Sequence, residues 1–337
     1  MTPPDFLQSL GHGIFRIDIG FRRAGCAAAY LLVHDGRGCF IDAGTTLSVP
    51  RLLAAVDAVG LAREAIDWVI PTHVHLDHAG GAGALMAFLP NARLLVHARG
   101  ARHMIDPTQL WEGALAVFGP DELARSYDSV SAVPVTRVEA ASDGTCVSVG
   151  RRRLTLFDSP GHARHHQCIW DETSGGCFAG DTFGLSYREF DTSRGPWIMP
   201  STPPVQFDPE ALRRSIHRIM ALAPRSIYLA HCGEVADLPR LSADLLAGVD
   251  RYEAIAGAAR GEQPPDMPAM ERNLFHWHAE SLANHGCTLD RRRIAELIDF
   301  DIHLNAHGIA GYAAQAIRDR PLDPPRSRPG SPARPHS

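Results

Sequence analysis

The sequence predicts an α+β protein in which a layered sheet domain is followed by a helical region. Three observations support this prediction. Strand and helix patterns alternate through the first third of the chain, strand patterns return between residues 152 and 231, and they disappear beyond residue 238. Alternating patterns are typical of proteins that pack helices on sheets, and two sheet-forming stretches suit the two halves of a layered fold. A chain of 337 residues is long enough for one large domain with an appendage.

The first third contains short apolar runs that predict strands, and one clear helix pattern. The strand patterns lie at residues 13–20, 28–34, 38–42, 66–70 and 92–98. A helix is predicted over residues 48–61, where Ser48 can cap the first turn, Pro50 suits its start, and apolar residues share one face. Residues 100–140 are less regular, and we expect an insertion near a substrate pocket there.

The middle of the chain returns to strand patterns before helical patterns take over. Residues 166–172 and 175–182 are expected to form a hairpin. Asp208 and Pro209 then begin a predicted helix. We predict three parts: a sheet domain over residues 1–237, a helical region over residues 238–318, and a disordered Pro- and Arg-rich tail over residues 319–337.

Composition and charge argue against two classes of partner. The net charge is −5, whereas a protein that binds nucleic acid normally carries a basic excess. No apolar run approaches the roughly 20 residues of a membrane helix, and the first residues lack a signal-peptide pattern. Seven scattered cysteines without a CxxC pair suit free thiols in a reducing compartment. We therefore expect a cytoplasmic protein with a small-molecule substrate, and leave a homo-oligomer open.

Imidazole and carboxylate side chains, which can bind metal ions, occur where the apolar strand patterns end. Eighteen histidines in 337 residues prompt a search for metal ligands. The stretch PTHVHLDHAGG, residues 71–81, carries three imidazoles and a carboxylate within six positions, directly after an apolar run. With similar groups behind later strand patterns, the candidate ligands are His73, His75, Asp77, His78, His162, Asp181 and His231. Because loops on a rigid sheet are where sites are usually built, we expect these seven side chains to converge.

Seven such groups are too many for one four-coordinate ion and suit two. Imidazole and carboxylate are ligands for zinc, iron or manganese, and we expect zinc first. The expected division is His73, His75 and His162 on one ion, Asp77, His78 and His231 on the other, and Asp181 as a bridge. Two divalent ions roughly 3.5–4 Å apart would share a water and lower its pKa from 15.7 to about 7. The residues therefore predict a dinuclear hydrolytic centre.

The same motifs resemble a known family. THVHLDH matches the HxHxDH signature of the metallo-β-lactamase superfamily, and SPGHARHH, AGDT and LAHCGE follow it in the family's order, with FIDAG ahead of it. The resemblance spans roughly residues 13–235 and implies the ligand assignment given above. It also implies a four-layer αβ/βα sandwich with the dimetal site at one edge of two facing sheets. The most similar branch contains hydroxyacylglutathione hydrolases and lactonases and has a C-terminal helical segment.

The resemblance and the sequence around these motifs suggest further site residues. Asp42 corresponds to a supporting residue that orients ligands through a hydrogen bond, and His166 occupies the family's second histidine position. His165 is expected to be solvated. Tyr187 is a candidate to stabilise an oxyanion or a substrate carboxylate, and Asp77 a candidate to move a proton. GHARHH stands where GHTPGH is typical, and the C-terminal region lacks a basic cluster, which argues against a glutathione thioester.

The predicted reaction is attack by a bridging hydroxide on an ester, lactone or thioester carbonyl. An apolar acyl group is favoured by the aromatic residues of the expected pocket, which are Trp111, Phe118, Phe183, Tyr187 and Trp197. The alternatives are an iron-dependent redox enzyme of the same fold acting on sulfur or oxygen, a phosphodiesterase, and a metal-stabilised binding module. Asp77 and His78 argue against a single iron, because they complete a second metal group. The sequence has no stripe of basic residues that could bind a phosphate backbone, which argues against a nucleic-acid substrate.

A further histidine pair lies in the helical region. His303 and His307 have the i, i+4 spacing that can bind a metal ion from one face of a helix. No Glu follows the first histidine, and the sequence offers no third ligand nearby. An ordinary helix face is therefore the favoured interpretation.

Overall fold

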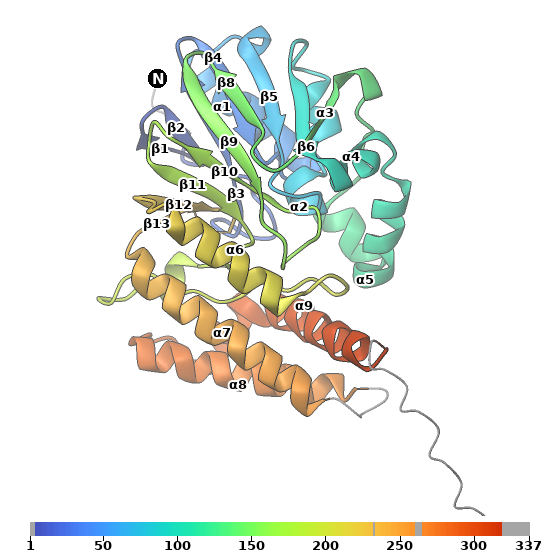
Figure 1. The fold of residues 1–337 in the computed structure, drawn as a ribbon, viewed down its shortest axis with the longest axis vertical. Coiled ribbons are helices and arrows are strands. Elements are labelled where there is room, and N and C mark those ends of the chain that lie inside the picture. The colour runs from blue at the N-terminus through green and yellow to red at the C-terminus, as the bar shows by residue number, and fades with distance from the viewer. Residues whose placement is uncertain (1–3, 232, 260–264, 319–337) are drawn as a thin grey trace, which may run out of the picture.

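Two β-sheets face each other at the centre of the computed structural model, which describes residues 4–231, 233–259 and 265–318 (Figure 1). The strands of the first sheet, in spatial order, are β1 Leu7–Gly11, β2 Ile14–Asp18, β3 Ala28–His34, β4 Arg37–Ile41, β5 Ile66–Ile70, β6 Arg93–His97 and β7 Val138–Ala141. Those of the second are β13 Glu234–Val235, β12 Ser226–Leu229, β11 Gly176–Gly180, β10 Gln167–Asp171, β9 Arg152–Asp158 and β8 Cys146–Val149. The tail predicted over residues 319–337 lies outside the described residues.

Helices cover the outer faces of the sheets and gather at one end of the sandwich. They are α1 Val49–Ala58, α2 Leu76–Ala79, α3 Ala82–Met86, α4 Ala98–Ile105, α5 Thr108–Ser126, α6 Pro209–Ala221, α7 Leu238–Ala258, α8 Met267–His285 and α9 Arg291–Arg318. In Figure 1, α7, α8 and α9 lie together below the sheets, and α6 lies between them and the second sheet. Asp208 caps α6 by accepting a hydrogen bond from the backbone of Ala211, with Pro209 in the first turn, as the sequence predicts.

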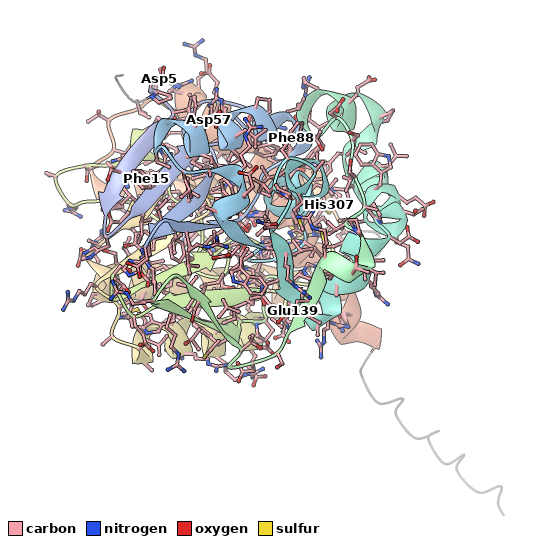
Figure 2. All side chains as sticks on the ribbon, turned by 90° about the horizontal axis from the view of Figure 1, so that it is seen from above. Asp5, Phe15, Asp57, Phe88, Glu139 and His307 are labelled. Carbon is pink, nitrogen blue, oxygen red and sulfur yellow. The ribbon has the colours of Figure 1, made fainter. Side chains whose placement is uncertain are left out.

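Apolar side chains from both sheets fill the space between them. Tyr30 and Leu32 of β3 and Ile41 of β4 pack with Ile169 and Phe178 of the second sheet in one buried cluster. Figure 2 shows the side chains from above, with Phe15 on β2 and Glu139 on β7 marking two strands that lie far apart in the first sheet. The opposite faces of the sheets bury apolar residues against the helices, which gives four layers.

The topology brings the ends of several strands to one edge of the sandwich. β4 pairs parallel with β5 in the first sheet, and β11 pairs parallel with β12 in the second. The carboxyl ends of paired parallel strands lie at the same edge. The motifs that follow β11 and β12 therefore leave the second sheet at one edge. The contact between His78 and Asp181 shows that the motif after β5 meets them there, although His73 and His231 are 158 positions apart.

The structure corrects one part of the sequence interpretation. Much of residues 100–140 is helical, because it holds the end of α4 and all of α5. The pattern was hidden because α5 is kinked at Gly119, whose φ of 75° is not helical, and because Pro120 follows it. The sequence interpretation also missed the short strands β1, β7, β8 and β13, whose two to five residues carry little periodic signal.

Candidate metal centre

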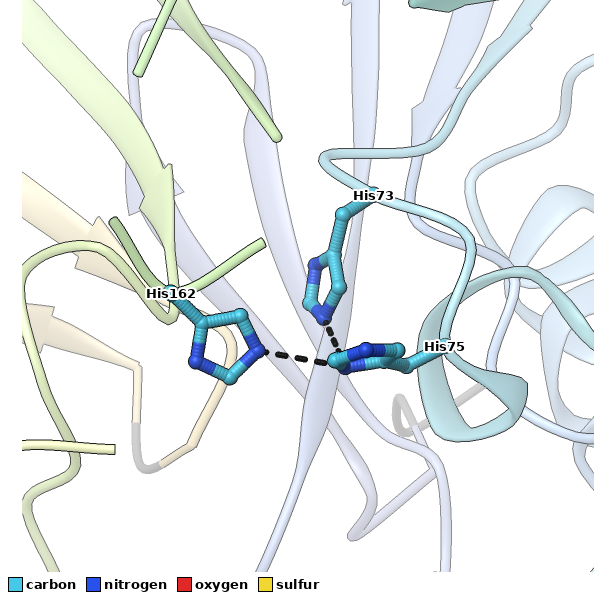
Figure 3. Close-up of side chains that lie close together, drawn as sticks. All are labelled: His73, His75 and His162. Atoms are coloured by element: carbon cyan, nitrogen blue, oxygen red, sulfur yellow. Dashed lines mark hydrogen bonds between the residues drawn. The ribbon is translucent and has the colours of Figure 1, made fainter. Parts of the chain in front are cut away.

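Three histidines meet at the edge where β5 and β9 end. The Nε2 atom of His73 lies 2.8 Å from Nδ1 of His75, and Nε2 of His162 lies 3.1 Å from the same atom (Figure 3). The ring of His75 is turned 79° from that of His73 and 66° from that of His162. Three ring nitrogens from two separate loops thus face a common point, an arrangement that suits one metal ion.

A second group of donors lies beside the first. The Nε2 atoms of His78 and His231 each lie 3.4 Å from Oδ2 of Asp77. Asp77 and His78 lie on the short helix α2, and His231 follows β12. All three side chains point ligand atoms at one another and suit a second ion.

The carboxylate of Asp181 lies between the two groups. Its Oδ2 atom is 3.6 Å from Nε2 of His162, and its Oδ1 atom is 3.5 Å from Nε2 of His78. Asp181 follows Gly180, whose φ of +48° turns the chain at the end of β11. A Cβ on Gly180 would lie 2.6 Å from Nε2 of His166, so a glycine is needed for this approach. The position of Asp181 suits the predicted bridging role.

Most of the candidate ligand imidazoles are held in place through their second nitrogen. The contacts are His73 Nδ1 with Thr72 Oγ1 at 3.1 Å, His78 Nδ1 with Asp42 Oδ2 at 3.2 Å, His162 Nδ1 with the Ser201 carbonyl at 3.0 Å, and His231 Nδ1 with the Cys26 carbonyl at 3.0 Å. Contacts of this kind fix the tautomer and the ring orientation of metal-binding histidines. They leave the Nε2 atom of each ring directed at the centre of the cluster.

Burial and mutual repulsion determine the protonation of the cluster. Burial lowers the pKa of His73 and His75 well below the ordinary value, and neighbouring histidines lower it further. Burial acts in the same direction on His78 and His231, but the nearby carboxylates, Asp77 among them, outweigh it and hold both pKa values well above the ordinary value. Divalent cations at the same position would neutralise these carboxylates in place of the two protons.

Two buried atoms support the fit of metal ions to this site. Nε2 of His78 and Oδ1 of Asp181 are both buried, and neither has a hydrogen-bond partner among the described residues. Buried polar atoms normally have partners, so a pair of orphaned atoms facing each other needs an explanation. A metal ion coordinated by both atoms would satisfy them.

The two predicted supporting residues both contact the site from outside. Oδ1 of Asp42 accepts hydrogen bonds from the backbone and the hydroxyl of Thr72, at 2.7 and 3.0 Å, beside its contact with His78. His166 accepts a hydrogen bond from the backbone N–H of Asp181 at 3.2 Å. His165 corrects the sequence interpretation: it is buried rather than solvated, 3.4 Å from the backbone nitrogen of Val74.

A cavity of about 820 Å³ adjoins the cluster. Its wall includes five of the candidate ligands, namely His75, Asp77, His162, Asp181 and His231. Much of the remaining wall is apolar and comes from α5 and α9, with Leu110, Ala114, Val117, Phe118, Leu297, Phe300 and Leu304. The prediction of pocket aromatics is right for Phe118 and Tyr187 and wrong for the other three. Phe183 and Trp197 are buried in the core, and Trp111 is partly buried and packs against it.

Tyr187 lies in the cavity wall with a partner that the sequence did not indicate. Its hydroxyl donates a hydrogen bond of 3.0 Å to Oδ2 of Asp301 on α9, and the guanidinium of Arg23 lies 4.5 Å from its ring centre. Burial raises the pKa of the Tyr187 phenol, and Asp301 raises it further, so the phenol stays protonated. Burial also raises the pKa of Asp301 to about 6. Any catalytic role of Tyr187, which stays a prediction, therefore involves Asp301.

A buried polar network connects the C-terminal helices to the candidate ligands. Asn305 of α9 accepts hydrogen bonds from the backbone and the hydroxyl of Thr202, at 2.7 and 2.9 Å. Ser201, which precedes Thr202 in the chain, donates a hydrogen bond from its hydroxyl to Oδ2 of Asp181 at 3.1 Å. Its carbonyl oxygen accepts one from Nδ1 of His162. The helical region therefore supports two candidate ligands through the segment 200–202. No sequence motif signals Asn305, Ser201 or Asp301, because none lies near the ligand motifs in the chain.

Comparison with known protein families matches the part of the chain that contains these motifs. A family model described as Metallo-beta-lactamase superfamily matches residues 24–231. The chain belongs to the metallo-beta-lactamase superfamily. This membership confirms the resemblance and the prediction of a metal-dependent hydrolase, and it implies divalent metal ions at the His and Asp cluster.

Three individual proteins illustrate this relationship. The metallo-beta-lactamase fold-containing protein ST1585 of Sulfurisphaera tokodaii is 26% identical over 218 residues, which cover 62% of this chain and 74% of that protein. The acyl-coenzyme A thioesterase MBLAC2 of Gallus gallus is 32% identical over 203 residues, covering 57% and 68%. A metallo-beta-lactamase family protein of Thermus thermophilus matches in structure with a TM-score of 0.63 at 22% identity, covering 92% of this chain and 95% of that one. The structural match confirms the predicted fold class with its helical extension.

The helices give one further result. Among the residues that the structure describes, no helix has both the length and the apolar composition that a bilayer span requires.

Proposed function

We propose that this chain hydrolyses an acyl ester, lactone or thioester with the help of two divalent metal ions, zinc being the first expectation. The observation that carries the proposal is the convergence of seven metal donors beside a cavity of about 820 Å³ with a largely apolar remaining wall. A relative named acyl-coenzyme A thioesterase supports a thioester as the first substrate to test. A small-molecule partner and a cytoplasmic location remain predictions from composition.

The chain's own residues supply placement and proton transfer in this proposal. The ions would be held by His73, His75 and His162, by Asp77, His78 and His231, and by Asp181 between the two groups. Bound there, divalent ions would supply a water of lowered pKa and a positive charge that polarises a carbonyl group. Asp77 lines the cavity, and we assign its carboxylate to take up the proton of the attacking water.

The apolar wall selects the acyl part of the substrate. Phe118, Phe300 and Leu304 can bury an alkyl chain that extends from the metal centre. Each buried methylene contributes about 0.8 kcal/mol to binding through the hydrophobic effect. Longer acyl groups should therefore bind more tightly until the cavity is filled.

The second group of donors favours hydrolysis over the iron-dependent alternative. Asp77, His78 and His231 lie within ligand distance of one another beside the first three histidines. A mononuclear redox site needs three ligands and an open face and would leave this second group without a role. The phosphodiesterase alternative is tested as an outcome of the experiment below.

The experiment combines an activity screen with metal analysis on the same sample of the full chain. Acyl-coenzyme A thioesters of increasing chain length, lactones and phosphodiesters are supplied separately, and bound metals are quantified. We expect turnover of an acyl substrate with about two zinc ions per chain. One iron per chain or a preference for phosphodiesters would contradict the proposal.

Variants of the candidate ligands provide the matched test. His75→Ala and Asp181→Ala should abolish hydrolysis while the protein still unfolds cooperatively. His217→Ala, which changes an exposed histidine on α6, serves as the control and should hydrolyse the substrate as the wild type does. Retained turnover in both ligand variants would rule out the proposed mechanism.

A further inference from the structure

A second cluster of metal donors lies on the C-terminal helices. Glu271 of α8 and His303 and His307 of α9 offer one ligand atom each, and these atoms lie within 4.8 Å of one another. The Oε1 atom of Glu271 is 2.7 Å from Nδ1 of His303. None of the three residues is among those that form the wall of the large cavity described above. The cluster is therefore separate from the candidate metal centre.

The geometry supplies the third donor that the sequence did not offer for the histidine pair. His303 and His307 are one turn apart, and their ring centres are 4.6 Å apart. The third donor, which the sequence did not indicate, comes from the neighbouring helix, 32 positions before His303. Packing of α8 against α9 brings it into place, so the donor set exists only in the folded chain.

We propose that Glu271, His303 and His307 bind a divalent transition-metal ion that joins α8 to α9. Two imidazoles and a carboxylate form a donor set that zinc and related ions accept, with water completing the coordination. The side chains of His303 and Glu271 are 48% and 35% exposed, so an ion can enter from solvent and exchange with it. The proposal does not depend on the reaction proposed above.

The surroundings of His307 favour the neutral imidazole, which is the form that binds a metal ion. Burial lowers the pKa of His307, and the neighbouring His303 lowers it further, which keeps the His307 imidazole neutral at neutral pH. Glu271 also acts on the nearby Asp299, whose pKa is raised first by burial and then by this carboxylate. A cation beside Glu271 would relieve that repulsion between the two acidic groups.

A bound ion would link this cluster to the cavity through α9. The same helix carries Phe300, Leu304 and Asn305 in the cavity wall. A ligand that binds the folded chain and not the unfolded chain stabilises the folded state, by an amount set by its concentration relative to its dissociation constant. Added zinc should therefore raise the unfolding temperature of the wild type by holding α9 against α8.

The test measures zinc uptake by the full-length holoenzyme, whose candidate metal centre is already loaded. Isothermal titration with zinc and metal analysis after dialysis should show one further ion per wild-type chain. His303→Ala and His307→Ala should each lose this uptake, and Glu271→Gln should weaken it. His276→Ala is the matched control because it removes an exposed histidine of α8 that pairs with Glu280 instead, and it should bind zinc as the wild type does.

Thermal unfolding separates loss of the site from loss of the fold. Without added zinc, His307→Ala should unfold at the temperature of the wild type, because its side chain is partly exposed. With added zinc, the wild type and His276→Ala should shift upward and His307→Ala should not. The proposal is overturned if the wild-type holoenzyme takes up no further ion, or if the histidine variants take up zinc and shift as the wild type does.

Discussion

Asn305 provides the sharpest test of how the helical region supports the metal centre. Its side chain accepts from the backbone N–H of Thr202 and donates to the Pro200 carbonyl at 3.1 Å and to the Tyr252 hydroxyl at 2.9 Å, all at buried positions. Asn305→Ala would leave the buried N–H of Thr202 without this acceptor, and an unsatisfied buried donor destabilises the folded state by about 1–3 kcal/mol. The Pro200 carbonyl keeps a long contact of 3.5 Å with Tyr252. With the lost packing of the amide, we expect the free energy of unfolding to fall by about 2–4 kcal/mol.

The assay for Asn305→Ala has two readouts on the holoenzyme. Urea unfolding gives the change in stability, with Asn284→Ala at an exposed position of α8 as the control, for which we expect a change within about 0.5 kcal/mol. Metal retention against a chelator reports on positioning, because Ser201 contacts both His162 and Asp181. Loss of a direct outer partner of a metal ligand typically weakens metal binding by about 10–100-fold. Asn305 acts one residue further away, through Thr202, so we expect the lower end of that range, about ten-fold. A stability equal to that of Asn284→Ala would refute the energetic argument, and unchanged metal retention would refute the positioning argument.

Two further predictions concern the cavity and the response to pH. Ala114→Trp should fill part of the cavity beside α5. The KM for long acyl substrates should rise by about ten-fold, with little effect on short ones. An unchanged chain-length profile would contradict the assigned pocket. Burial lowers the pKa of His278 from 6.5 to about 3, so the unfolded chain binds more protons between these values and stability falls as the pH drops below 6.5. His278→Gln keeps a partner for the Tyr252 hydroxyl but cannot take up this proton. Between pH 6.5 and about pH 5, its free energy of unfolding, measured by urea titration, should fall by about 2 kcal/mol less than that of the wild type. Parallel pH profiles for the two proteins would argue against this assignment.

Local sequence determined most of the strands of the sandwich and about half of the metal centre. The apolar run at residues 66–70 forms β5, and Asp208 with Pro209 begins α6, because strand periodicity and helix capping act over a few residues. His73, His75, Asp77 and His78 lie within six positions, so a single turn after β5 is enough to bring their side chains together. Short strands and the kinked helix α5 escaped prediction because their local signal is weak or interrupted.

Tertiary structure decided which distant residues join them. His162 reaches His75 across 87 residues, and the hydrogen bond from Thr202 to Asn305 spans 103. Family resemblance anticipated His162 because its motif stands in a known order, but Asn305 belongs to no motif. Glu271 likewise lies beside His303 only because α8 packs against α9. Spacing in a sequence reports on neighbours within a helix or a turn, whereas contacts between elements depend on how buried faces pack, and only the folded chain fixes that.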